Sequence, residues 1–153
     1  MIKVNVFVGD RNWIKYLKDP KKYLQIKILK LRKNQKFFRN RKMEFSLKLT
    51  GTKEIKRLNK KFRNKNSTTD ILSFPFYEKK SIKKFLKTKK NFYLGDIVIN
   101  LNKVKRNNKK NLNNSFDKLW IHGLLHLLGY KHKLNKDYLK MLKLENSFLK
   151  SIN

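Results

Sequence analysis

One apolar segment toward the C-terminus carries all three histidines of this 153-residue chain. It reads His122-Gly123-Leu124-Leu125-His126-Leu127-Leu128-Gly129-Tyr130-Lys131-His132. Because His122 and His126 are four residues apart, a helix projects both imidazoles from one face. Gly129 favours a helix end in the left-handed backbone conformation, which turns the chain and brings His132 back toward the other two. The segment therefore predicts an apolar, buried helix with three imidazoles gathered at its end.

Three neutral imidazoles that leave one coordination position open are typical of a catalytic zinc site. The chain contains no cysteine, which excludes thiolate metal sites and disulfides. We therefore predict that His122, His126 and His132 bind one Zn²⁺ per chain, although three imidazoles also accept nickel, cobalt or copper. The alternative interpretation is a buried helix end whose histidines are only polar core residues.

The residue after the first histidine distinguishes zinc peptidases from other hydrolases that use three histidine ligands. The spacing His-x-x-x-His-x-x-Gly-x-x-His is that of the metzincin peptidases, in which a glutamate follows the first histidine and acts as general base. Here that position is Gly123. A zinc peptidase is therefore disfavoured, whereas hydrolysis of a phosphodiester remains open because zinc lowers the pKa of a bound water to about 7.

The charge balance points to a polyanionic partner. Lysine and arginine number 41 against 10 acidic residues, which gives a formal net charge of +31. Such a surface binds nucleic acid by releasing counterions from the phosphates. An AT-rich coding sequence would also account for part of this charge, because Lys, Asn, Ile and Phe abound and Ala is absent.

The periodicity predicts one α+β domain over residues 1–153, with a small mixed sheet of about four strands packed against several helices. Strands are expected over 2–8, 43–49, 70–76 and 95–100, with Pro75 at an edge or an end. The expected helices are 13–38, interrupted near Pro20, one opened by Gly51 with Thr52 as its cap, 101–106, 112–128 and 135–152. The lysine-rich stretch 78–91 is expected to be a mobile loop. No apolar run approaches the roughly 18 residues of a membrane span and no signal peptide is evident, so we expect a cytoplasmic protein without a membrane partner.

Further segments extend the pattern beyond the histidines. They are Leu58-Asn59-Lys60-Lys61-Phe62-Arg63, Thr69-Asp70-Ile71-Leu72-Ser73-Phe74-Pro75, Leu94-Gly95-Asp96-Ile97-Val98-Ile99 and Met141-x-x-Leu144-Glu145. These segments resemble, in the same order, segments of the YbeY family of bacterial metal-dependent endoribonucleases. The histidine segment is similar to that family's signature, His-Gly-x-Leu-His-Leu-x-Gly-Tyr-Asp-His. The resemblance covers roughly residues 43–150.

The resemblance implies a single-strand-specific endoribonuclease that acts in 3′-end maturation of small-subunit rRNA and in ribosome quality control. Its partners would be single-stranded rRNA and the small ribosomal subunit, with no DNA specificity and with the oligomeric state left open. The zinc ligands would be the three histidines. Arg63 matches a family arginine near the metal, where its planar guanidinium would hold the scissile phosphate. From the residues alone, the favoured interpretation of Arg63 is a solvated arginine at a helix end.

Position 131 departs from the family pattern, because Lys131 stands where an acid usually precedes the last histidine. Losing an acid that orients a ligand or accepts a proton would cost about 10- to 100-fold in affinity or activity. The favoured alternative is a side chain that faces solvent and only adds charge near RNA. Asp70 and Asp96 are candidates for a proton acceptor, but a local turn or backbone role is favoured for both.

Aromatic residues among lysines offer stacking platforms for RNA bases. The candidates are Phe37-Phe38, Phe76-Tyr77 and Tyr130, of which Tyr77 and Tyr130 are favoured because phenylalanines more often pack in the core. A second hypothesis of a different class is an RNA-binding or ribosome-binding assembly factor whose metal is structural. The zinc peptidase is the third.

Overall fold

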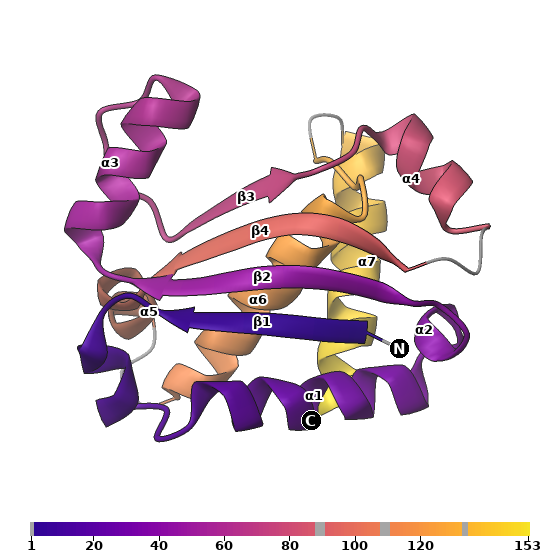
Figure 1. Ribbon diagram of the computed structural model, residues 1–153, viewed down its shortest axis with the longest axis horizontal. Coiled ribbons are helices and arrows are strands. Elements are labelled where there is room, and N and C mark those ends of the chain that lie inside the picture. The colour runs from indigo at the N-terminus through magenta and orange to yellow at the C-terminus, as the bar shows by residue number, and fades with distance from the viewer. Residues whose placement is uncertain (1, 88–90, 108–110, 133–134) are drawn as a thin grey trace.

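A computed structural model describes residues 2–87, 91–107, 111–132 and 135–153. Within these ranges, four strands form one mixed sheet in the order β1-β2-β4-β3, which leaves β1 and β3 at the edges. β1 pairs with β2 and β2 with β4 in parallel, whereas β3 runs antiparallel to β4. The strands, visible in Figure 1, are β1 (Ile2–Val8), β2 (Met43–Thr50), β3 (Ile71–Pro75) and β4 (Phe92–Asn100).

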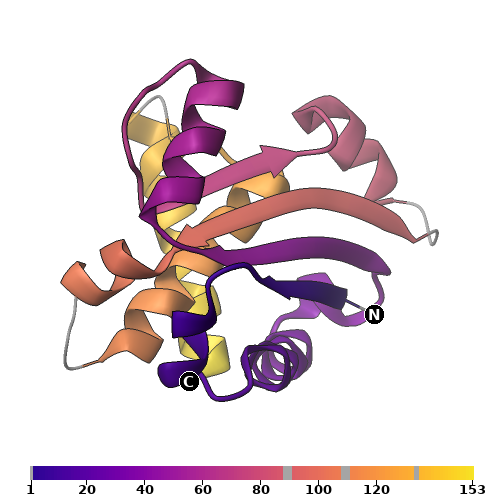
Figure 2. The same cartoon turned by 60° about the vertical axis from the view of Figure 1, so that its left-hand side comes forward.

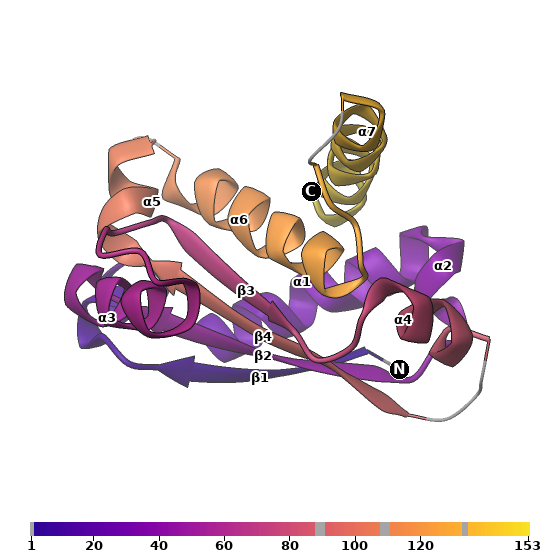
Figure 3. The same ribbon diagram turned by 90° about the horizontal axis from the view of Figure 1, so that it is seen from above.

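Most of the helical mass lies on one face of the sheet, as Figure 3 shows. The helices on this face are α1 (Pro20–Asn34), α2 (Lys36–Arg39), α6 (Leu112–Leu127) and α7 (Asn135–Ile152). α1 runs alongside the edge strand β1 (Figures 1 and 2). The remaining elements are a short 3-10 helix η1 (Arg11–Lys15), α3 (Thr52–Arg63), α4 (Lys79–Phe85) and α5 (Leu101–Asn107). None of the described helices is long and apolar enough to cross a membrane.

The apolar periodicity of the strands builds the core between the sheet and these helices. Alternate residues of β2 are fully buried on this face, namely Met43, Phe45, Leu47 and Leu49. The central helix α6 adds Trp120 and Leu124, which are also fully buried. α3 packs on the opposite face, where Ile55 joins Leu72 and Val98 in a small second cluster. The result is a single α+β fold with a main core on one face of a four-stranded sheet.

Gly123 sets the distance between α6 and the sheet. A Cβ built at this position would lie 2.9 Å from Ile97 Cδ1 and 3.0 Å from Ile71 Cδ1, closer than side chains normally approach. A larger residue would require Ile97 and Ile71 to shift or the helix to move away from β3 and β4. The position where a peptidase carries its glutamate therefore faces the packed sheet in this protein.

A buried carboxylate ties α6 to α1. Asp117 is fully buried, and its Oδ1 accepts a hydrogen bond from Trp120 Nε1 at 2.8 Å. Its Oδ2 accepts from the Tyr23 hydroxyl at 3.0 Å and pairs with Lys27 Nζ at 2.9 Å. Burial raises the pKa of Tyr23, and the Asp117 charge raises it further, so the phenol remains a donor. Both carboxylate oxygens are thus satisfied by partners from two helices.

The structure confirms the predicted strands, although β4 begins at Phe92, before the expected start. It also confirms the helix over 135–152 and the break before Pro20, which begins α1. Two local predictions are wrong. Thr52 does not cap α3, because Gly51 holds the N-cap position and the Thr52 hydroxyl donates to Asn100 Oδ1 at 3.4 Å.

The second error concerns the stretch 78–91, which contains α4 in place of the expected mobile loop. The helix forms because Ile82 is buried and the ring of Phe85 stacks on Phe92 at 5.7 Å. Two apolar contacts among many lysines are too few to give a clear periodic pattern in the sequence. Residues 88–90 of that stretch lie outside the described ranges.

Candidate metal centre

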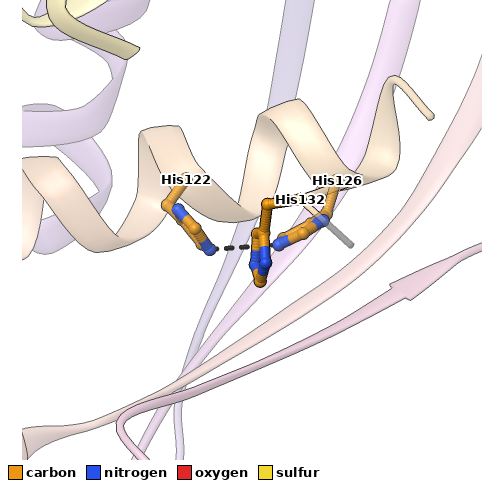
Figure 4. A group of neighbouring side chains, drawn as sticks. All are labelled: His122, His126 and His132. Atoms are coloured by element: carbon orange, nitrogen blue, oxygen red, sulfur yellow. Dashed lines mark hydrogen bonds between the residues drawn. The ribbon is translucent and has the colours of Figure 1, made fainter. Parts of the chain in front are cut away.

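The three histidines converge at the C-terminal end of α6. His122 and His126 leave the same face of the helix, and His132 returns to them from the segment beyond it (Figure 4). One nitrogen from each ring can be chosen so that all three lie within 4.8 Å of one another. The first two side chains are half-buried and the third is exposed, so the group opens to solvent on one side.

The turn that delivers His132 has the backbone pattern expected for a glycine after a helix. Gly129 has a φ of +85°, in the left-handed region. Its N–H donates to the His126 carbonyl at 2.9 Å, and the Tyr130 N–H donates to the Leu125 carbonyl at 3.0 Å. These are the two bonds of a Schellman motif. The predicted glycine turn is confirmed.

Hydrogen bonds on the far side of two rings fix their tautomers. His122 Nδ1 lies 3.0 Å from Glu145 Oε2, and His126 Nδ1 lies 2.9 Å from the Tyr130 carbonyl oxygen. Since both partners are acceptors, both Nδ1 atoms donate and carry the ring proton. Burial and the neighbouring His122 lower the pKa of His126 to about 4, so this imidazole is neutral at physiological pH. In the neutral form of each ring, Nε2 carries an unprotonated lone pair.

The two Nε2 atoms face each other at 3.0 Å, the contact marked in Figure 4. Two lone pairs at this distance repel, and a proton between them would require one ring to become cationic or to give up its Nδ1 bond. A bound cation resolves the conflict, because it accepts both lone pairs. Two imidazole nitrogens on one tetrahedral zinc, with Zn–N of about 2.0–2.1 Å, lie about 3.3 Å apart. The donor set therefore fits a single metal ion.

Glu145 is a residue of the candidate site that its local sequence did not assign. It lies on α7, 23 positions after His122 in the sequence, and its side chain is only 19% exposed. A carboxylate behind a ligating imidazole orients the ring and makes it a better donor. Glu145 stood at the end of a family-like segment, but nothing in its local pattern showed which histidine it would contact.

We expect Glu145→Gln to weaken metal binding by about 10- to 100-fold while the protein remains folded, because the amide removes the charge that supports His122. Competition with a calibrated chelator measures the change in affinity. The matched control is Glu78→Gln, an exposed glutamate immediately before α4. Equal metal affinity for Glu145→Gln and the control would contradict the role assigned to this carboxylate.

Arg63, the last residue of α3, reaches β3 beside the histidines. Its Nη2 donates to the Ser73 carbonyl oxygen at 3.2 Å. The Arg63 charge is also one of those that lower the pKa of His126, so the guanidinium lies within electrostatic range of the site. Asn64 then ends the helix in the left-handed conformation, with a φ of 54°. The structure thus brings together the arginine and the histidines that the sequence analysis singled out.

Comparison with known proteins agrees with this arrangement. The family model described as Endoribonuclease YbeY matches residues 11–153. The chain belongs to the YbeY family. The Endoribonuclease YbeY of Pelagibacter ubique strain HTCC1062 is 42% identical over 155 residues, covering 99% of this chain and 97% of that protein. That of Thermodesulfovibrio yellowstonii is 40% identical over 112 residues, covering 70% and 65% of the two chains.

A solved structure shows the same fold. The solution structure of TM1509 from Thermotoga maritima aligns with a TM-score of 0.56 at 22% identity, covering 99% of this chain and 89% of that one. Together with the family match, this supports the α+β assignment over nearly the whole chain.

At position 131, where the YbeY pattern has an acid, the Lys131 side chain is exposed. The solvent-facing interpretation is therefore the one that fits. Asp70 and Asp96 accept hydrogen bonds from the Thr69 and Tyr93 hydroxyls at 3.2 and 2.7 Å.

The structure reverses the preference among the stacking candidates. Phe38 is fully buried, and Phe37 packs against it with ring centroids 4.8 Å apart. Tyr77 is half-buried against Phe85, and Tyr130 is also half-buried. Phe76, which ranked below Tyr77 in the sequence analysis, is 65% exposed. Phe76 is exposed because it lies just after the end of β3. The sequence pattern did not show where that strand ends.

Proposed function

We propose that this protein is a metal-dependent endoribonuclease that cuts single-stranded RNA, with zinc held by His122, His126 and His132. The observation that carries the proposal is the pair of fixed tautomers, which aims two Nε2 lone pairs at one point in a chain of the YbeY family. The open fourth position of such a site suits a hydrolytic rather than a structural metal.

Each protein group near the site has a distinct task in this proposal. When bound, zinc supplies Lewis-acid polarisation of a phosphoryl oxygen and lowers the pKa of a coordinated water. Glu145 holds the His122 ring in the donating orientation. Arg63 binds the phosphate through its planar fork and stabilises the charge that develops on its oxygens. Gly123 offers no carboxylate, so the general base of a peptidase is absent from its usual place.

The biological substrate we propose is the 3′ region of small-subunit rRNA, with a role in ribosome maturation and quality control in the cytoplasm. The family membership supports the RNA substrate. The net charge of +31 supports a polyanionic partner as large as a ribosomal subunit. This charge also favours a second candidate, a ribosome-binding assembly factor whose metal is structural. Cleavage of RNA by the purified protein, absent from a matched histidine variant, separates the two.

Replacing Arg63 by alanine tests the phosphate-binding role. We expect cleavage of single-stranded RNA to fall by about 100- to 1,000-fold, since removal of one preorganised donor to a developing anion costs this much. Metal content should stay unchanged, because Arg63 binds no metal. The kcat of a fluorogenic RNA substrate and elemental analysis give the two readings.

The control for this variant is Lys56→Ala, which removes an exposed charge from the same helix α3. It should change cleavage by little more than its contribution to general RNA attraction. A similar fall for both variants would show that Arg63 contributes only charge, and undiminished cleavage by Arg63→Ala would remove it from the mechanism.

A further inference from the structure

The face of the sheet opposite α6 carries a concentration of exposed aromatic rings. Of the eleven phenylalanines, all of which lie in the described ranges, three are exposed. They are Phe7 at 57%, Phe62 at 58% and Phe76 at 65% exposure. In the view of Figure 1 the strands lie in front of α6, so this face is turned toward the reader. We call Phe7, Phe62, Phe74, Phe76 and Tyr93 the aromatic face.

Four of these rings form two contacting pairs over β3 and its neighbours. Phe62 on α3 contacts Phe74 on β3, with ring centroids 5.2 Å apart. Phe76 contacts Tyr93 on β4 at 5.9 Å. Phe74 lies near the end of β3 and Phe76 lies just after it, so the two pairs are neighbours along the chain. Neighbouring rings of this kind can meet neighbouring unstacked bases.

Between the rings the surface is hollowed. A depression of about 380 Å³ is lined by Phe7, Phe62, Phe74 and Val98, together with Ser46 and Lys48. Its volume falls within the range of roughly 300–1,000 Å³ that small-ligand sites occupy. Exposed apolar surface that is hollowed and rimmed by polar groups marks a binding site more often than an accident of folding.

Two acids close to the depression, Glu44 and Glu54, are paired with basic side chains. Glu54 is neutralised by Lys48 at 3.0 Å and by Arg57 at 2.9 Å, and Glu44 pairs with Lys3 at 3.2 Å. Lys61 Nζ lies over the Phe62 ring at 5.3 Å, where it can meet a phosphate beside a stacked base. Asp96 remains as an acid on this face, bonded to the Tyr93 hydroxyl.

The aromatic face adjoins Arg63. Arg63 follows Phe62 in α3, and the carbonyl that it contacts belongs to Ser73, the residue before Phe74. A single strand whose phosphate lies at Arg63 would therefore pass directly onto Phe62 and Phe74. This continuity with Arg63 favours RNA over a protein partner.

We propose that the aromatic face is a base-stacking platform that holds the single-stranded RNA on one side of the cleavage site. The proposal rests on the proposed function for the identity of the nucleic acid. Stacking on phenylalanine is tolerant of sequence, because every base has a π-face. The platform would select for unpaired RNA, since bases within a duplex cannot reach the rings.

The test compares wild-type protein with Phe62→Ala/Phe76→Ala in binding a labelled, 2′-O-methylated single strand of about 12 nucleotides, within the usual site sizes. A second probe of equal length lacks bases but keeps the phosphates. We expect the double variant to bind the first probe at least about 10-fold more weakly and the second probe as wild type does. Phe62→Tyr/Phe76→Tyr should restore binding, and Leu29→Ala, an exposed apolar residue on α1, should not alter it.

Equal binding of the first probe by wild type and the alanine variant would overturn the platform. Equally weakened binding of both probes by the alanine variant would also overturn it, because the loss would then come from charge or from misfolding. The binding assay does not depend on cleavage. If the wild-type protein binds through these rings but cuts no RNA, the proposed function fails and the platform stands.

Discussion

His126→Ala is expected to reduce bound zinc from about one ion per chain to a trace and to abolish RNA cleavage. The reason is that His126 supplies one of the two Nε2 lone pairs that face each other at 3.0 Å, and two remaining imidazoles bind a catalytic metal weakly. Elemental analysis of the isolated protein and a cleavage assay on the same preparation measure both effects.

The matched control is Lys118→Ala, an exposed residue on the same helix α6. It should keep full metal content and nearly full activity. Cleavage that persists in the metal-free His126→Ala protein would exclude the metal mechanism. Retention of one zinc by this variant would instead exclude His126 as a ligand.

Asp117→Ala is expected to cause the largest loss of stability of any single change considered. It leaves Lys27, Tyr23 and Trp120 without their shared acceptor in the interior, and breaking a buried ion pair in this way costs about 3–5 kcal/mol. For a chain of this size, that loss lowers Tm by roughly 10 °C or more. Thermal unfolding followed by circular dichroism measures it.

Asp19→Ala serves as the comparison, because Asp19 is an exposed acid whose side chain only caps α1 through the Lys22 N–H. Its loss should cost about 1 kcal/mol. If Asp117→Ala melts within a few degrees of Asp19→Ala, the buried network does not support the contact between α1 and α6.

The local features of the fold were predictable because they depend on neighbours in the sequence. The spacing of His122 and His126 and the glycine turn at Gly129 are set within one helix and its cap. β2 alternates because every second side chain is fully buried on the core face of the sheet. These local features repeat at the period of a helix or a strand or depend on one turn, so the order of the residues alone identifies them.

The features that were missed depend on how distant segments pack. Glu145 reaches His122 only because α7 lies beside α6, and Asp117 finds Lys27 across a separation of 90 positions in the sequence. The exposed ring of Phe76 depends on where β3 ends. No periodic pattern encodes these relations, since each is fixed by the tertiary arrangement of two or more elements.

The most direct measurement of the central claim is a titration of chelator-stripped protein with Zn²⁺, followed by cleavage of a single-stranded RNA. We predict that activity is absent at the start, rises in proportion to added zinc and levels off at about one ion per chain, as one three-histidine site requires. Duplex RNA of the same sequence should be cut far more slowly. Full cleavage by the stripped protein, or no cleavage at any zinc content, would contradict the account.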